Sequence, residues 1–404
     1  MNGSLAWVKT KELSDSWIWD TEEHINEEAL HNSSARLLPP NTLLVAMYGA
    51  TAGQLGLLAR EMACNQACCA MVTDEALAHY RFLFYQLLAH KAELKGLAIG
   101  AAQQNLSATG LANLVLPFPS LSEQRAVACL LGALDDKIEL NRRTNETLEA
   151  MASAIFKSWF VDFDPVRAKM EGHQPFGMDP ELALLFPDLF TPGSTGWIPS
   201  GWNLAAIDDC VTVVGGSTPS TKVPSFWGGT IAFATPKDMA SLESFPLLQT
   251  ARSITEAGLS TISSGLLPAG TVLLSSRAPI GYTGISEIPV AINQGFIAMK
   301  CDGELPSSFV LYWTRHSLPA IIANASGTTF LEISKKNFRP IQALVPPDPV
   351  LRAFEQLTSP LHRKIVNNLQ ESSLLGQLRD ILLPKLMSGH LRVADVDKLV
   401  EGVV

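Results

Sequence analysis

An internal repeat constrains the fold of this sequence more than any other feature. The matching segments are 5–13 with 231–239, 36–44 with 265–273, 53–56 with 281–284, and 65–68 with 293–296. In the first pair LAWVKTKEL aligns with IAFATPKDM, and in the last NQAC aligns with NQGF. The offset stays between 226 and 229 residues throughout. Self-similarity at a nearly fixed offset predicts two copies of one folding unit in tandem.

Each copy continues into a long amphipathic helix. Ser120 followed three residues later by Glu123 is a capping box, which marks a helix N-terminus. Behind it, seam positions alternate spacings of four and three over about four heptads, the pattern of a coiled coil. They are Val127, Leu131, Leu134, Ile138, Asn141, Asn145, Leu148, Ala152, Ile155 and Trp159. A weaker stripe returns 227 residues later, so helices are predicted near 120–160 and 347–387.

Two asparagines interrupt these stripes at equivalent positions, Asn141 and Asn368. A long helix can tolerate a polar seam residue where it faces solvent. Alternatively, a buried Asn specifies register, because a slipped pairing would leave its amide against leucine. Recurrence in both copies favours the second interpretation. If a dyad relates the two repeats, the helices pair antiparallel and Asn141 lies close to Asn368.

The segments before the helices predict mixed α/β domains. Short Val/Ile/Leu runs punctuated by Pro and Gly, as in 43–47 and 271–275, predict strands, interleaved with short helices such as 81–90 and 308–316. The expected fold class is α+β, with two mixed α/β domains each followed by a long helix, and the helices forming an antiparallel coiled coil. The expected boundaries are 1–118 (first domain), 119–160 (first helix), 161–196 (connector), 197–346 (second domain), 347–390 (second helix) and 391–404 (tail). The connector is rich in Pro and Gly and is expected to contain at most a short helix near 180–185.

The two domains are unequal. The segment 197–230 precedes the repeated part of the second domain and has no counterpart before Leu5. We therefore expect the first domain to be N-terminally truncated and to lack the opening strands of the second. Readout by the first domain would then be degraded.

Composition excludes several classes of protein. With 47% apolar residues among 404, the chain can bury sizeable cores, yet no apolar run reaches the ~18 residues that span a bilayer. The N-terminus lacks the features of a secretory signal and six irregularly spaced cysteines form no disulfide framework, so a cytoplasmic protein is expected. The net charge of −9 argues against coating nucleic acid by bulk attraction, but not against local contacts.

The sequence predicts neither a catalytic site nor a cofactor or metal. It has no phosphate-binding loop, no dinucleotide-binding glycine pattern and no His-Glu-x-x-His. Cys64, Cys68 and Cys69 lack the paired spacing of structural zinc sites. The repeat places Ile292, Phe296 and Ile297 at the matching positions, which indicates core positions where cysteine packs as a small apolar residue.

Several phrases resemble the DNA-specificity subunit of type I restriction–modification enzymes. They are GGSTPST at 215–221 with FWGG at 226–229, LSEQR at 121–125, and SWFVDFDPV at 158–166. The order domain–helix–domain–helix is similar too, and the resemblance covers nearly the whole chain. It implies a non-catalytic subunit in which each domain reads one half of a split DNA target. The helices would hold the domains apart and dock methyltransferase subunits.

The partners that this resemblance implies are double-stranded DNA and two methyltransferase (modification) subunits. The ATP-dependent restriction subunit is a further candidate partner, and no membrane is involved. Acidity fits such a complex, because the methyltransferases can neutralise phosphates while this chain reads bases. Alone, the chain should bind DNA poorly.

Candidate DNA contacts are polar or basic residues that the repeat places on loops. Lys11 is equivalent to Lys237, Tyr48 to Arg277 and Gln54 to Tyr282, flanking a glycine-containing turn. Equivalent places with different side chains are what two domains reading different half-sites would need. Ordinary surface variation explains any single residue almost as well. The set is completed by Ser217, Thr218, Ser220, Lys222 and Trp227.

Two other functions remain open at this point. One is a structural scaffold that bridges two partner subunits through the repeat without reading DNA. The other is a decayed, inactive specificity subunit, which the short first domain suggests. Salt-dependent binding to random and genomic DNA, measured with the partner present, would separate these from a DNA-reading subunit.

Overall fold

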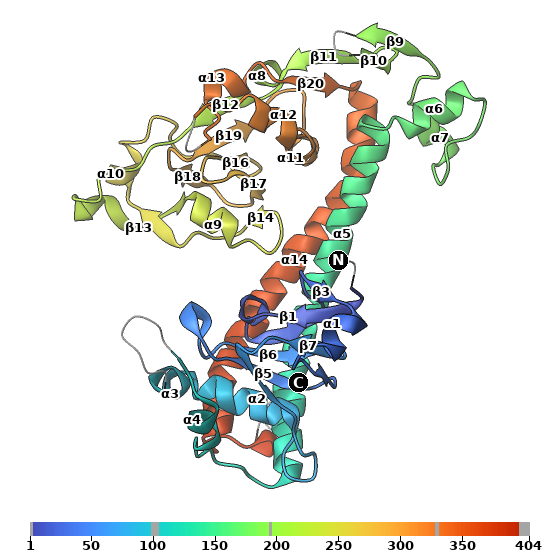
Figure 1. The fold of residues 1–404 in the computed structure, drawn as a ribbon. Helices are drawn as coiled ribbons and strands as arrows, with labels where there is room; N and C mark the ends of the chain where they lie inside the picture. The colour runs from blue at the N-terminus through green and yellow to red at the C-terminus, as the bar shows by residue number, and fades with distance from the viewer. Residues whose placement is uncertain (1–2, 98–104, 194–195, 328–330, 396–404) are drawn as a thin grey trace. The chain divides into compact units, whose positions relative to one another are not determined.

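The computed structural model describes residues 3–97, 105–193, 196–327 and 331–395. The chain divides into two compact units, residues 1–139 with 371–404 and residues 140–370. The division cuts both long helices, α5 (Leu121–Phe160) and α14 (Asp348–Met387). Each unit therefore contains one mixed α/β domain and one half of each helix (Figure 1).

The first unit contains two four-stranded sheets. One has the order β3-β1-β7-β4 and the other β2-β6-β5-β8. Their strands are β1 (Leu5–Val8), β2 (Ser16–Ile18), β3 (His24–Ile25), β4 (Leu37–Leu38), β5 (Leu43–Ala46), β6 (Leu55–Leu58), β7 (Met62–Cys64) and β8 (Cys68–Met71). β5 and β6 are wholly buried, as their unbroken apolar sequences LLVA and LGLL require.

Short helices complete the first unit. They are α1 (Glu27–His31), α2 (Tyr80–Ala89), α3 (Lys91–Gly96) and α4 (Ala108–Ala112), with 3-10 turns η1 (Thr10–Glu12) and η2 (Gly49–Thr51). The buried face of α2, including Phe82 and Tyr85, belongs to one apolar cluster with Val127 and Leu131 of α5 and Leu386 of α14. This cluster attaches the α/β domain to its halves of the long helices.

The second unit is built on a five-stranded sheet of order β12-β19-β16-β17-β14. A three-stranded sheet, β15-β13-β18, and the pairs β11-β20 and β9-β10 accompany it. The strands are β9 (Phe190–Gly193), β10 (Gly196–Pro199), β11 (Asn203–Ala206), β12 (Thr212–Gly215), β13 (Trp227–Ala234), β14 (Pro246–Leu247), β15 (Arg252–Ile254), β16 (Val272–Ser276), β17 (Ile280–Ser286), β18 (Val290–Ile292), β19 (Phe296–Lys300) and β20 (Gln342–Val345).

The second unit also contains short helices, and one of them, α11, belongs to an aromatic core. They are α6 (Asp164–Met170), α7 (Pro180–Ala183), α8 (Ile207–Cys210), α9 (Pro236–Ala240), α10 (Glu256–Leu259), α11 (Ser307–His316), α12 (Leu318–Ala323) and α13 (Lys335–Phe338), with the 3-10 turn η3 (Pro224–Phe226). Phe309 of α11 packs edge-on against Phe156 and Phe160 of α5, with ring centroids 5.2 and 5.0 Å apart. Such pairs contribute about 0.5–1.5 kcal/mol each beyond their buried area.

The strands that the sequence repeat aligns pair in the same way in both units. β5 pairs antiparallel with β6 and β8, as β16 pairs with β17 and β19. β1 runs parallel to β7 as β13 runs parallel to β18. Even the register recurs, since Leu44 faces Gly56 in one sheet and Leu273 faces Gly284 in the other. The predicted fold class, two mixed α/β domains each followed by a long helix, is confirmed.

The long helices run antiparallel within each unit. In the second unit Asn141 lies beside Asn368, and the rings of Phe156 and Phe354 are 6.0 Å apart. A later residue of α5 thus contacts an earlier residue of α14, so the two helices run in opposite directions. In the first unit an ion pair joins Asp135 to Arg379 across the helices. The predicted antiparallel pairing is confirmed.

The connector holds more structure than the sequence pattern predicted. The expectation of at most one short helix is wrong, because α6 and the β9–β10 hairpin accompany α7. Proline is favoured in the first turn of a helix, and Pro165 stands in the first turn of α6. Arg167 and Lys169 in the last turn favour the helix C-terminus.

No helix among the described residues is long and apolar enough to cross a membrane.

Candidate nucleic-acid interface

The repeated Asn-Gln pair forms the centre of the candidate interface. In the second unit Asn293 begins a turn, and the Asn293 side-chain oxygen accepts a hydrogen bond from Gly295 N (2.9 Å). The Asn293 backbone N donates to Ala234 O, at the end of β13 (3.2 Å). Gly295 O accepts from Ser276 N, at the end of β16 (2.8 Å). The turn is thus tied to the ends of two strands that belong to different sheets.

The first unit builds the same turn from its own copy of the pair. Asn65 Oδ1 accepts from Ala67 N (3.1 Å), and Asn65 N donates to Val8 O at the end of β1 (3.1 Å). Ala67 O accepts from Met47 N, just after β5 (2.8 Å). We call residues 65–67 and 293–295 the Asn-Gln turns. In both, the asparagine shapes the turn and the glutamine, Gln66 or Gln294, is exposed.

Several sequence-predicted residues gather around the second Asn-Gln turn. Thr218 Oγ1 donates to Gln294 Oε1 (2.6 Å). Lys237 lies in α9 directly after Pro236, and a Cβ at Gly295 would be only 2.8 Å from Cγ of that proline. Arg277 follows Ser276, whose backbone holds the turn. Three segments remote in sequence therefore meet at this turn, and they carry Thr218, Lys237 and Arg277.

The loop that carries Thr218 follows β12 and passes close to the turn. A Cβ at Gly216 would lie 1.9 Å from the carbonyl oxygen of Ile292, so only glycine permits this approach. Beyond it, Ser217 is half-buried, whereas Ser220 and Lys222 are exposed. This contact explains the second glycine of the GGSTPST phrase.

The first Asn-Gln turn has a sparser set of polar neighbours. Lys11 lies in η1, just beyond the end of β1, and Tyr48 lies just beyond β5 with 44% of its surface exposed. Lys11 forms an ion pair with Glu22, and this hydrogen-bonded carboxylate raises the pKa of the lysine. In the second unit, by contrast, Lys222 and Lys237 have no ion pair among the described residues. Arg277 has a distant one, 3.9 Å from Glu332.

Three predicted contact residues lie in other environments. The Gln54 side-chain oxygen accepts from Lys91 Nζ (2.7 Å), which also pairs with Asp15. Tyr282 lies on β17 and packs against an apolar cluster of the second domain. Trp227 donates its indole N–H to Ser220 O (3.2 Å) and is covered by the Arg252 guanidinium, 3.6 Å from the ring centroid. These contacts give all three a structural role.

Sequence reasoning did not include Gln66 and Gln294 among the candidate contacts. Both belong to the NQ pair that the repeat aligns, so the signal was present in the sequence. What the alignment could not supply is the turn geometry. The asparagine points inward to bond its own backbone, while the adjacent glutamine is exposed at the apex.

The seam asparagines form a hydrogen-bonded cluster in the second unit. Asn141 Nδ2 donates to Asn368 O (3.4 Å), and Asn368 Nδ2 donates to Asn145 Oδ1 (2.8 Å). All three residues are at most 3% exposed. The structure thus brings Asn141 and Asn368 together; whether they fix the register of the helices stays a prediction.

The cysteine cluster packs into apolar surroundings. Cys68 and Cys64 belong to the core cluster around β1 and β7, and Cys69 packs on the cluster beneath α2. Burial raises the pKa of Cys64 to about 11 and that of Cys68 to about 12. At neutral pH both are protonated thiols, which are poor metal ligands and poor nucleophiles.

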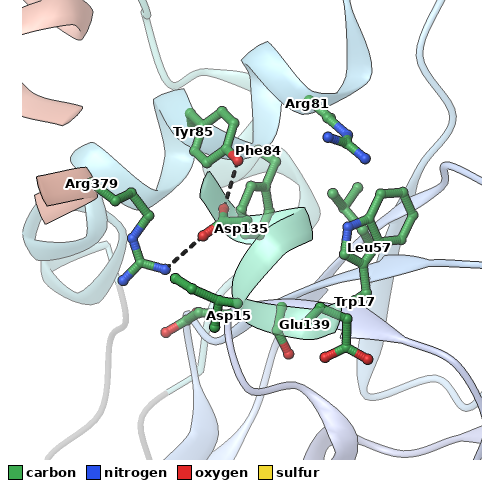
Figure 2. A pocket seen from close by; sticks show the side chains of 11 residues that line it. Asp15, Trp17, Leu57, Arg81, Phe84, Tyr85, Asp135, Glu139 and Arg379 are labelled. Atoms are coloured by element: carbon green, nitrogen blue, oxygen red, sulfur yellow. Dashed lines mark hydrogen bonds and ion pairs between the residues drawn. The ribbon is translucent and has the colours of Figure 1, made fainter. Parts of the chain in front are cut away.

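A small polar pocket lies where the first α/β domain meets the long helices. Figure 2 shows Asp135 of α5 between two donors: Tyr85 Oη of α2 (2.6 Å) and Arg379 Nη1 of α14 (2.9 Å). Arg81 of α2 forms a bidentate pair with Asp136 (2.8 and 2.9 Å) and lies over Trp17. The cavity volume of about 80 Å³ holds only a few waters. The pocket is therefore a structural junction.

These features define a class: two repeated α/β domains, each presenting a polar turn and attached to an antiparallel helix pair. A family model described as the type I restriction modification DNA specificity domain matches residues 1–150 and 199–370. The chain belongs to this family.

Individual relatives agree with this assignment. The chain is 26% identical over 409 residues to the type I restriction enzyme MjaIX specificity subunit of Methanocaldococcus jannaschii. This match covers 98% of this chain and 88% of the relative. It is 28% identical over 323 residues to the HindI specificity subunit of Haemophilus influenzae, covering 70% of each. Among solved structures, the type I restriction–modification S subunit from M. genitalium is similar, with a TM-score of 0.58. That match has 17% identity over 95% of this chain and 88% of the other, and so shows the fold.

Proposed function

We propose that this chain is the sequence-specific DNA-recognition subunit of a type I restriction–modification complex. Each α/β domain reads one half of a bipartite target, and the chain itself performs no catalysis. The observation that carries this is the pair of Asn-Gln turns: one scaffold, built twice, with different side chains around it. Two domains that read different half-sites need a constant frame and variable contacts.

The side chains around the turns have the chemistry for this task. A glutamine amide can bond adenine in bidentate fashion, and an arginine can bond guanine, in the major groove. Lysines such as Lys222 and Lys237 suit phosphate contacts, which position the domain without reading sequence. We assign base reading to Gln294 and Arg277 in the second domain, and to Gln66 and Tyr48 in the first.

Two methyltransferase subunits complete the complex, and the ATP-dependent restriction subunit is a further partner. An acidic chain needs partners that neutralise DNA phosphates. In the first unit α14 carries an exposed apolar row at helical spacing, formed by Leu374, Leu378 and Ile381. An exposed row of this kind suits docking of a partner protein. We propose that one methyltransferase packs on it.

The experiment that tests the function uses the chain purified with its cognate methyltransferase. DNA fragments selected from a random pool by this complex are sequenced, and a split motif with a fixed spacer is the expected result. If the complex assembles but enriches no sequence, the chain is a scaffold that bridges its partners, or an inactive specificity subunit. A motif confined to one side would overturn the assignment of reading to the first domain.

A further inference from the structure

The loop after β12, residues 216–222, begins beside an exposed lysine. A Cβ built at Gly215, the last residue of β12, would lie 3.2 Å from Nζ of Lys335, so the lysine side chain passes over the end of this strand. The backbone ties the same segment to the Asn-Gln turn. Ile333 N donates to Ser276 O (3.0 Å), and Ser276 N bonds the turn (2.8 Å). Lys335 therefore belongs to the surroundings of the candidate interface.

The same loop ends beside a stacked arginine. Trp227 Nε1 donates to Ser220 O (3.2 Å), and the exposed Arg252 places its guanidinium 3.6 Å from the centroid of the Trp227 ring. Phe233 holds that ring from another side, edge-on at 5.4 Å. A guanidinium that stacks through its face keeps its in-plane N–H groups free for an acceptor. Within the described part of the chain, no side chain or carbonyl accepts from them.

Ion pairing separates these two cations from others of the second domain. Lys300, Arg315 and Arg339 pair with carboxylates at 3.6, 3.0 and 3.2 Å. The lysines and arginines of this domain that form no ion pair with any described residue are Lys222, Lys237, Arg252, Lys335 and Lys336. All but the last lie in the loop, at one of its ends or beside the Asn-Gln turn. In a chain of net charge −9, such a gathering of unpaired cations indicates an anionic ligand.

We infer that Lys335 and Arg252 contact DNA phosphates at the two ends of the loop, and that Trp227 is a positioning residue for Arg252. The inference rests on the proposed function and extends the interface of the second domain beyond Gln294. Thr218, within the loop, bonds that glutamine, whereas the two cations lie at the margins.

Phosphates are assigned to these cations because of where they lie and what they can bind. Base edges form the floor of a DNA groove and phosphates form its rims, so cations at the margins of a base-reading centre meet phosphates. The planar fork of Arg252 matches two phosphate oxygens, and Lys335 supplies a point charge. Stacking on Trp227 holds the fork in one orientation before DNA arrives, which reduces the entropy lost on binding.

The test measures the salt dependence of DNA binding by the chain assembled with its methyltransferase, on selected and on random DNA. Lys335→Ala and Arg252→Ala should each make the slope of log affinity against log salt shallower by about 0.9, because each removes one phosphate contact. Both changes should appear on both DNAs, and the preferred sequence should stay the same. Lys300→Ala is the matched control. It removes a cation of the same domain, paired with Asp302, at the end of β19 remote from the Asn-Gln turn, and should leave the slope unchanged.

Arg252→Lys separates the stacked fork from the charge. This variant keeps the positive charge, so its salt slope should equal that of the parent. Its affinity should fall about two- to fivefold, because lysine has neither the planar fork nor the same stacking on the indole. Affinity equal to that of the parent would show that Trp227 does not position the contact.

The outcomes separate this inference from the proposed function. Unaltered slopes in both alanine variants would overturn the phosphate contacts. So would relaxation of a single base position by Arg252→Ala, because the arginine would then read a base. Both results leave the proposed function intact as long as the parent complex selects its motif. A parent complex that binds DNA without selecting a motif would refute the proposed function, while the slopes on random DNA would still decide the phosphate contacts. A complex that binds no DNA would refute both.

Discussion

At the scale of single residues, the exposed glutamines of the Asn-Gln turns carry the sharpest prediction. Replacing Gln294 by Ala should cost about 1–3 kcal/mol of binding free energy and relax one position of one half-site. Gln66→Ala should do the same in the other half-site. Affinities of the methyltransferase complex for the selected DNA and its single-base variants measure both effects. Gln356→Ala, an exposed glutamine on α14, is the control. Equal behaviour of all three variants would show that the turns do not read bases.

The carboxylate of Asp135 should matter for stability. It accepts from both Tyr85 and Arg379, and burial beside this carboxylate raises the pKa of the Tyr85 phenol, which stays a donor. Asp135→Asn should lower the free energy of unfolding by about 2 kcal/mol, because the two bonds use both carboxylate oxygens and an asparagine has only one oxygen. Asp380→Asn is the control, since Asp380 also bonds Arg379 but is largely exposed. Urea unfolding curves with equal midpoints for both variants would contradict the stabilising role of the Asp135 carboxylate.

Cysteine reactivity should follow burial. Cys129 is exposed, whereas burial holds the pKa of Cys64 near 11 and that of Cys68 near 12. A raised pKa leaves less thiolate below it, so iodoacetamide at about pH 8 should label Cys129 first. Labelling of Cys64 should rise as the pH approaches its pKa. Peptide mass mapping across a pH series checks the order, and early labelling of Cys68 in the folded chain would contradict it.

At the scale of elements, the buried asparagines of α5 and α14 should fix the register of the helix pair. A slip of one heptad would bury each amide against an apolar side chain, at a cost of about 1–3 kcal/mol per unsatisfied group. Asn141→Cys combined with Asn368→Cys should therefore crosslink under mild oxidation. Asn141→Cys combined with Leu361→Cys, one heptad away, is the control pair. Crosslinking of the control pair instead would show a different register in solution.

The helices themselves could be predicted closely from the sequence. The stripe from Val127 to Trp159 lies within α5, and the hydrogen bond of Ser120 Oγ with Glu123 N (3.4 Å) forms one half of the predicted capping box. Heptad spacing and caps are local signals, which act within a few residues. The connector was predicted less well. Whether Asp164-Pro165 ends one helix or begins another depends on what packs against it.

At the scale of the whole molecule, the number of phosphate contacts governs the salt dependence of DNA binding. The chain carries −9 at pH 7, so alone it should bind DNA weakly. In the methyltransferase complex, log affinity should fall linearly with log salt, by about 0.9 per phosphate contact. Lys222→Ala with Lys237→Ala should make that slope shallower by roughly 1.8, because two contacts are lost. The double variant should keep its sequence preference, whereas Arg352→Ala on α14 should leave the slope unchanged. An unaltered slope in the double variant would show that these lysines do not touch phosphates.

The sequence alone determined the tandem architecture, the two helices and the placement of Asn141 beside Asn368. Each follows from a periodic pattern, and periodic patterns are read along the chain. Only the tertiary structure decided which polar residues share a surface. Thr218, Lys237, Arg277 and Gln294 come together because backbone hydrogen bonds join the ends of strands from two sheets. It also decided that Trp227 and Gln54 are engaged within the protein. Contacts between residues remote in sequence depend on sheet order, and no local propensity encodes that order.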